Sequence, residues 1–132
     1  MHRMTPETRL SIRIDSEMGK IGARQIAFLE AIESQGSISG ASRFTGLSYP
    51  GARLVIKGIN KALGEPAVSA VKGGREGGGA ALTPAGTQLV QLYRAIEMRV
   101  QAVALPERRE LQKTCTRKRY PSENRGQLKR SG

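Results

Sequence analysis

Apolar and polar residues alternate over residues 9–15 and then repeat every three or four positions over residues 23–35. The alternation predicts a short, half-buried strand at a sheet edge. The two glycines in residues 18–22 predict a loop after it. The helical spacing predicts a helix whose buried stripe is Ile26, Leu29 and Ile32. Gly36 follows this helix, and we expect it to end the helix in a left-handed cap.

Residues 36–64 predict two consecutive helices joined by a tight turn. A short helix is expected at about residues 39–44, with Ser37 or Ser39 as its N-cap. A turn at residues 45–47 leads to a longer helix that opens at Ser48. Ser48 can accept a hydrogen bond from the free amides of the first turn, where Pro50 also fits.

The longer helix is amphipathic. Its apolar residues step by three and four, which predicts one buried stripe: Ala52, Ile56, Ile59 and Leu63. A second face carries an aromatic ring and three positive charges: Tyr49, Arg53, Lys57 and Lys61. A basic helix behind a short helix and a glycine turn is typical of a DNA-binding helix-turn-helix, although an ordinary helix with solvated charges remains the alternative.

The segment after Gly64 predicts a β-hairpin with a glycine-rich tip. Residues 67–72 and 80–82 are the expected strands, and residues 73–79 form the tip between them. This is the position of the wing in a winged helix, where backbone amides, Lys72 and Arg75 would meet the sugar-phosphate edge. A plain flexible surface loop is the alternative.

Thr83 and Pro84 give a strong helix start, and the apolar positions that follow predict a helix to about residue 104. Its stripe repeats almost as a heptad: Ala85, Leu89, Leu92, Ile96, Val100 and Val103. A small domain has little core to cover so long a stripe. We therefore expect Leu89, Leu92, Ile96, Val100 and Val103 to meet a second copy of the chain, giving a homodimer.

Composition points to a polyanionic partner. The 132 residues fit one domain and carry a formal net charge of +11. Residues 106–132 hold nine Lys/Arg and three Asp/Glu, and the remaining 13 basic and 8 acidic residues leave +5 for residues 1–105. We expect residues 1–105 to form the domain and residues 106–132 a basic, disordered tail. That tail either adds salt-dependent DNA affinity or is only solvated.

The side chains that carry catalysis are scarce. The only histidine is His2 and the only cysteine is Cys115, so no Cys/His cluster is available for a metal. We expect no enzyme activity, no metal and no cofactor. No apolar run approaches the ~20 residues that span a bilayer. These features predict a cytoplasmic protein that does not enter a membrane.

Several short motifs together resemble the DNA-binding domain of the ModE family, which are molybdenum-responsive winged-helix transcription regulators. They are GSIS-x-A, L-S-Y, I-N-x-x-L-x-E-P-x-V and the wing ending in G-G-G-A-x-L-T-x-x-G, and they cover about residues 9–99. The most specific piece is residues 73–83. A more distant similarity, through S-x-P-x-A, is to the LysR-type regulators. ModE-like sequences usually carry a basic residue and a tryptophan where this chain has Pro50 and Arg53, so a different operator is expected.

The resemblance implies a homodimer on a palindromic operator. With the pattern of charges it assigns DNA contacts to the helix-turn-helix and the wing: Ser39, Arg43, Ser48, Tyr49, Pro50, Arg53, Lys57, Lys72 and Arg75. Full-length ModE also carries molybdate-binding domains, and the sequence gives no molybdate site. We therefore expect an α+β winged helix-turn-helix that represses transcription from double-stranded DNA. The alternatives are an architectural DNA-coating protein that uses the basic tail and, more weakly, a protein-protein adaptor.

Overall fold

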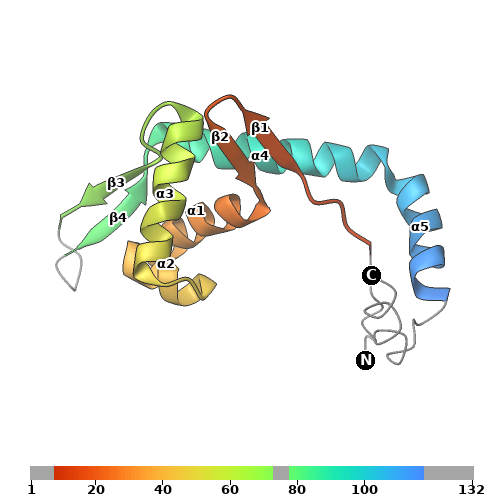
Figure 1. Cartoon of the computed structure of the whole chain (residues 1–132), viewed down its shortest axis with the longest axis horizontal. Helices are drawn as coiled ribbons and strands as arrows, with labels where there is room; N and C mark the ends of the chain where they lie inside the picture. The colour runs from red at the N-terminus through yellow and green to blue at the C-terminus, as the bar shows by residue number, and fades with distance from the viewer. Residues whose placement is uncertain (1–7, 73–77, 118–132) are drawn as a thin grey trace, which may run out of the picture. The chain divides into compact units, whose positions relative to one another are not determined.

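The computed structural model describes residues 8–72 and 78–117 (Figure 1). Its elements in chain order are β1 (Arg13–Ser16), β2 (Gly19–Gly22), α1 (Ala23–Gln35), α2 (Ile38–Thr45), α3 (Tyr49–Leu63), β3 (Val68–Val71), β4 (Gly79–Leu82), α4 (Pro84–Val103) and α5 (Leu105–Arg117). The chain divides into two compact units. The main unit is residues 11–99, and the described residues of the second unit are 8–10 and 100–117.

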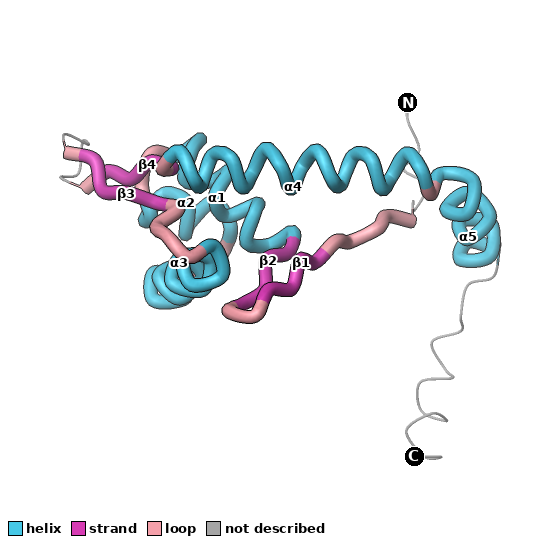
Figure 2. Tube along the Cα trace, turned by 90° about the horizontal axis from the view of Figure 1, so that it is seen from above, coloured by secondary structure: helices cyan, strands magenta, loops and turns pink. Residues whose placement is uncertain are grey.

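Helix α1 is the centre of the main unit and lies between α3 and α4 (Figure 2). Its apolar side chains are buried on more than one face: Ile26, Phe28, Leu29, Ala31 and Ile32. On one side, Phe28 and Ile32 pack with α2, α3 and the β3–β4 hairpin. On another side, Ile26 packs with Ile21 and Tyr93. A helix covered in this way explains why its sequence carries more apolar residues than a one-sided stripe needs.

The predicted caps of the helix-turn-helix are confirmed. The Ser37 hydroxyl accepts a 2.9 Å hydrogen bond from the Gly40 amide at the start of α2. The Ser48 hydroxyl accepts one of 3.0 Å from the Gly51 amide at the start of α3. Helices α1, α2 and α3 each end at a glycine with φ of 75°, 77° and 83°, in the left-handed region that glycine adopts without a Cβ clash. The short polar segments therefore fix where each helix stops.

The β3–β4 hairpin has the predicted position and is antiparallel. Val68 pairs with Leu82 at its base, and Val71 pairs with Gly79 toward the tip. A 2.9 Å hydrogen bond from the Ala80 amide to the Gly36 carbonyl joins β4 to the end of α1. The fold is an α+β winged helix, as the sequence predicts. Residues 73–77 of the tip, including Arg75, lie outside the described residues.

The prediction of a loop at residues 18–22 was wrong, because Gly19–Gly22 forms strand β2. It pairs antiparallel with β1, with Ile14 opposite Ile21 and Ser16 opposite Gly19. The strand β1 covers Arg13–Ser16, only the later part of the expected residues 9–15. A Cβ on Gly19 would lie 3.0 Å from the Ala62 Cβ, so the glycine permits β2 to approach α3 closely.

Helix α4 begins as predicted. The Thr83 hydroxyl accepts a 3.0 Å hydrogen bond from the Gly86 amide and donates one of 2.7 Å to the Pro66 carbonyl. At Gly86 the helix meets the chain before β3 so closely that a Cβ there would lie 2.2 Å from the Ala67 carbonyl oxygen. The start of α4 is therefore anchored to the base of the wing.

The second unit contains helix α5, which the sequence analysis did not predict. Residues 106–132 were expected to be a disordered tail, whereas residues up to 117 are helical. Pro106 lies in the first turn of α5, where a missing N–H costs no hydrogen bond, so this proline opens a helix. The Arg108 guanidinium donates a 2.6 Å hydrogen bond to the Gln101 side chain, which donates one of 2.9 Å to the Leu10 carbonyl. Residues 118–132 lie outside the described part.

Candidate nucleic-acid interface

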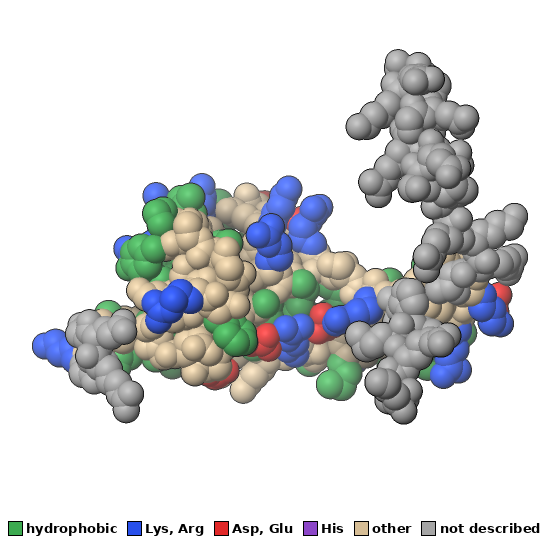
Figure 3. Space-filling view, turned by 90° about the horizontal axis from the view of Figure 1, so that it is seen from below, with side chains coloured by type: hydrophobic (Ala, Val, Ile, Leu, Met, Phe, Trp, Pro, Cys, Tyr) green, Lys and Arg blue, Asp and Glu red, His purple; other side chains and the backbone are tan. Residues whose placement is uncertain are grey.

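Five exposed cations of the main unit lie on α2, α3 and the wing: Arg43, Arg53, Lys57, Lys61 and Lys72. Other exposed cations lie elsewhere on this unit, among them Lys20, Arg24 and Arg99. Among the described residues, none of these five forms an ion pair, whereas Arg13, Arg94 and Lys113 do. No acidic residue occurs between Ile38 and Leu63. Seen from below, Lys and Arg side chains protrude at several points with hydrophobic side chains between them (Figure 3). This surface has positive charge available for an external anion.

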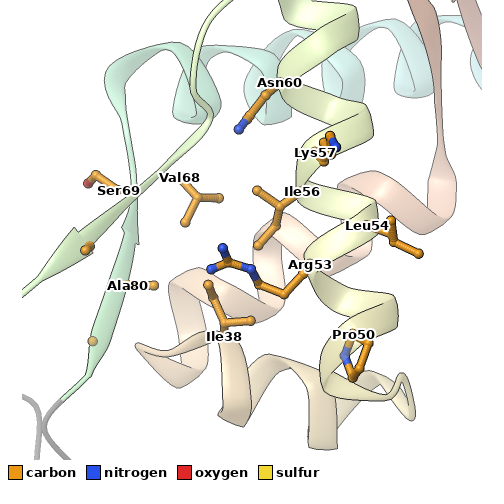
Figure 4. Close-up of a pocket in the computed structure, with 12 residues that line it drawn as sticks. Ile38, Pro50, Arg53, Leu54, Ile56, Lys57, Asn60, Val68, Ser69 and Ala80 are labelled. Carbon is orange, nitrogen blue, oxygen red and sulfur yellow. The ribbon is translucent and has the colours of Figure 1, made fainter.

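A groove of about 750 Å³ runs between α3 and the wing. Its α3 side is formed by Pro50, Arg53, Leu54, Ile56, Lys57 and Asn60, and its hairpin side includes Val68, Ser69, Ala70, Gly79 and Ala80. The Arg53 side chain extends toward the hairpin, whereas Leu54 points away from it (Figure 4). Arg53 therefore places a guanidinium between the helix and the wing, where it can donate to an anion or a base edge.

Two side chains fix the wing relative to α3. The Asn60 side-chain carbonyl oxygen accepts a 2.8 Å hydrogen bond from the Ala67 amide, just before β3. The Thr83 hydroxyl holds the Pro66 carbonyl from the other strand. The sequence analysis gave Asn60 no role, because a contact with a residue seven positions later, across the end of α3 and the turn after it, has no periodic signal. The groove therefore has a fixed geometry at its base.

The structure brings only some of the predicted DNA contacts together. Pro50, Arg53 and Lys57 share the groove with Ser69 and Ala70. Tyr49 is 49% exposed at the start of α3, and Arg43 is exposed in the last turn of α2. The two predicted serines differ. Ser48 is exposed but uses its hydroxyl as the α3 cap, and Ser39 is half-buried inside α2.

Lys72, the predicted DNA contact on the described part of the wing, does not line this groove. Lys72 is exposed and lines a second cavity of about 470 Å³, together with Glu33 and Gly36 at the end of α1. The sequence prediction for Arg75 cannot be compared, since that residue lies outside the described range. As DNA contacts, all these residues stay predictions.

Comparison with known proteins gives a consistent set of relatives. The chain is 49% identical over 78 residues to the molybdenum-pterin-binding protein MopB of Rhodobacter capsulatus, which covers 59% of this chain and 29% of MopB. It is 41% identical over 90 residues to the molybdenum transport protein ModE of Azotobacter vinelandii, and the match covers 67% of this chain and 33% of that protein. It is 34% identical over 90 residues to the DNA-binding transcriptional dual regulator ModE of Escherichia coli K12, and the match covers 68% of this chain and 34% of that protein. The chain is a ModE homologue.

The match is to a part of these relatives. The chain spans about a third of the length of the ModE and Mop proteins that it matches. No family model matches the sequence. The resemblance to the ModE DNA-binding domain, expected from the motifs, is confirmed by these homologues.

The predicted dimerisation stripe of this ModE homologue is split by the structure. Leu89 packs inside the main unit beside Tyr93 and Ala67, so it belongs to the core. The later positions are exposed: Leu92 by 55%, Ile96 by 42%, Val100 by 37% and Val103 by 81%. Their role in a dimer stays a prediction, now limited to these four. Among the described residues no helix is long and apolar enough to cross a membrane.

One polar cluster of the ModE homologue was missed by sequence reasoning. Glu30 forms a two-point ion pair with Arg94, at 2.6 and 3.0 Å. Arg94 also pairs with Glu97 at 2.7 Å. The hydrogen bond to Arg94 lowers the pKa of Glu30, and burial raises the pKa of Tyr93. These residues join α1 to α4, on the side of α1 away from α3, so they stabilise the scaffold of the interface.

Proposed function

We propose that this ModE homologue is a sequence-specific double-stranded DNA-binding regulator of transcription. The observation that carries the proposal is the exposed, unpaired set of cations on α3 beside a groove that ends at the wing. An α-helix fits the major groove of B-DNA, and the first turns of a recognition helix contact base edges. The relatives named transcriptional regulators support the same role.

In this arrangement α3 enters the major groove and the hairpin meets the adjacent backbone. Arg53, which extends into the groove between them, donates to a guanine edge or to the phosphate next to it. Lys57 and Lys61 neutralise phosphates, and Lys72 does so from the wing. Because Pro50 and Arg53 replace residues usual in ModE-like sequences, the operator differs from that of other ModE proteins.

The regulator acts as a homodimer on a palindromic site, and occupancy of a promoter represses transcription. The exposed stripe of α4 supports the dimer, because four large apolar side chains on one helix face lack cover within the described residues. The two α3 helices of the dimer, one helical turn of DNA apart, would then contact the two half-sites.

Selection of bound sequences from a random duplex pool tests the proposal. We expect one palindromic sequence to be enriched and bound at least a hundredfold more tightly than random duplex. Arg53→Ala is expected to reduce that ratio about tenfold, since a good base contact contributes about 1–3 kcal/mol of discrimination. Lys113→Ala, which removes an exposed cation from α5, serves as the charge-matched control. Equal binding of selected and random duplexes would contradict the proposal.

The basic C-terminal residues support a second candidate, an architectural protein that coats DNA. Residues 118–132 carry five Lys/Arg and one Glu. A chain ending at Arg117 keeps every described element, so its DNA binding separates the two functions. Retained discrimination between the selected and random sequences supports the regulator. Loss of nearly all affinity, with no discrimination in the full chain, supports coating.

We also propose that the regulated genes serve molybdenum uptake or use, and that this chain itself does not bind molybdate. The first part rests on relatives named for molybdenum transport and molybdenum-pterin binding. The second rests on the sequence, in which no motif offers a molybdate site. Calorimetric titration with sodium molybdate should give no binding heat, and a stoichiometric heat would overturn this part.

A further inference from the structure

Leu54 is the most exposed large apolar residue of α3. Successive residues of an α-helix are rotated by about 100°. On this wheel the buried stripe of Ala52, Ile56, Ile59 and Leu63 lies within about 40° of the direction opposite Leu54. The side chain is 69% exposed, so an apolar group lies on the outer face of the helix. Arg53 lies about 100° to one side, toward the wing, as Figure 4 shows.

The next turn of the same face is left open by Gly58. A Cβ on Gly58 would meet nothing within 4 Å, so the fold does not require a glycine there. Glycine within a helix is less favourable than alanine, and nothing within the described residues offsets that cost. A bare backbone beside Leu54 fits a partner surface that approaches the helix closely.

The charges around Leu54 indicate which kind of partner approaches. Lys57 and Lys61 lie on the same face, about 60° and 20° from Leu54 on the wheel, and both are exposed and unpaired among the described residues. Cations along one side of an exposed apolar residue fit a groove with phosphates along its edge and base edges at its floor. An apolar protein partner would leave these ammonium groups to be desolvated without compensation.

We infer that Leu54 is a specificity-determining residue that packs against the 5-methyl group of a thymine in the major groove. The thymine methyl is the apolar group that B-DNA displays on this edge, and it distinguishes thymine from the other bases. Burial of one methyl group against an aliphatic side chain strengthens binding about three- to tenfold. This inference rests on the proposed DNA-binding function and names the base feature that α3 reads beside Arg53.

Uracil substitution tests the contact directly, because uracil lacks only the methyl group of thymine. The probe is the duplex enriched from the random pool, with each thymine of a half-site replaced by deoxyuridine in turn. With the full chain, one replacement should weaken binding about three- to tenfold, measured by fluorescence anisotropy. Leu54→Ala should weaken binding to the thymine duplex by a similar factor and show no further loss at that uracil.

A leucine-to-alanine change at Leu111, 51% exposed on α5, is the matched control and should keep the uracil effect. If Leu54→Ala keeps the full uracil effect, or if no thymine replacement affects the full chain, the inference is overturned while the proposed function stands. If the pool yields no preferred sequence, the proposed function fails and this inference fails with it.

Gly58→Ala gives an independent check of close approach. Adding a methyl group should raise the melting temperature of the free protein, because the site is open and alanine favours the helix. The same change should weaken binding to the selected duplex at least threefold. A variant that is more stable and binds DNA as tightly as the unchanged chain would contradict the approach of a groove floor to this face.

Discussion

The Tyr93 hydroxyl donates a 2.6 Å hydrogen bond to the carbonyl oxygen of Ile12, across 81 residues of sequence. Tyr93 is 1% exposed, and its ring packs with Ile21 and Ile26. A single side chain thus ties α4 to the chain that leads into β1. Sequence reasoning placed the stripe of α4 on other positions and did not single out Tyr93, because one tyrosine in a helix gives no periodic signal.

Tyr93→Phe should lower the free energy of unfolding by about 1 kcal/mol, since the Ile12 carbonyl loses its partner. The change should also alter how the free energy of unfolding depends on pH in alkaline solution. The pKa of Tyr93 is raised in the folded state, so the unfolded chain ionises first and stability falls as pH rises above about 10. Urea unfolding at pH 7 and at pH 10.5 should show a smaller alkaline loss for Tyr93→Phe than for the unchanged chain. An equal loss would show that groups other than Tyr93 cause the fall in stability at alkaline pH.

Glu30→Gln tests the ion pair between α1 and α4. The pKa of Glu30 is lowered by Arg94, so its contribution is complete above the unfolded value of about 4.3 and is lost as pH falls through the folded value. Both side chains are more than a third exposed, and solvent screening limits the loss on substitution to about 1 kcal/mol at neutral pH. Glu33→Gln, an exposed carboxylate on the same helix, is the control and should change unfolding by less.

Gly86→Ala should destabilise the fold strongly, by about 3 kcal/mol, because the new Cβ would lie 2.2 Å from a backbone oxygen that cannot rotate away. Either α4 or the segment at Ala67 has to move. Thermal unfolding measures the effect, and a melting temperature within 2 °C or so of the unchanged chain would show that the approach relaxes at low cost.

Ile96→Glu should convert the proposed dimer into monomers at micromolar concentration, because it places a charge in the middle of the exposed stripe of α4. Met98→Glu is the matched control. Met98 is 73% exposed on the same helix but lies about 160° away from Ile96. Sedimentation measures the mass of both variants. A dimeric Ile96→Glu variant, or a monomeric unchanged chain, would reject this stripe as the interface.

Lys72→Ala should weaken binding to all duplexes by a similar factor and reduce the slope of log affinity against log salt by about 0.9. The physical reason is that a wing lysine releases about one counterion when it meets a phosphate. Arg53→Ala should instead reduce the preference for the selected sequence. If Lys72→Ala changed sequence preference and left the salt slope intact, the wing would be reading bases.

The parts of the fold that were predicted correctly have local causes. Ser37, Ser48 and Thr83 cap helices with their own hydroxyls. Gly36 and Gly64 end helices by adopting the left-handed backbone conformation. These signals lie within a few residues of the helix ends. The amphipathic stripe of α3 was equally visible, because a period of 3.6 residues needs no knowledge of the rest of the fold.

The missed parts depend on distant contacts. Strand β2 contains two glycines and one large apolar residue, and it is a strand because β1 pairs with it and α3 lies against Gly19. Helix α5 has Pro106 in its first turn, but a proline also suits the position just after a helix end, so the sequence alone was ambiguous there. The groove required the Asn60 contact to Ala67, which sets the position of the wing. The outward position of Leu54 could be predicted from the helical wheel. The sequence analysis chose the DNA-contacting face of α3 by its basic residues and so left Leu54 out.

The hydrogen bond between the Gly36 carbonyl and the Ala80 amide has a consequence for how this chain tolerates changes in length. The glycine that ends α1 also anchors β4, so the spacing between α1 and α2 is tied to the position of a strand more than 40 residues later. An inserted residue beside Gly36 would shift either the wing or the helix-turn-helix. Relatives that differ in length are therefore expected to vary at the hairpin tip and beyond α4, and to keep the segment around Gly36 at constant length.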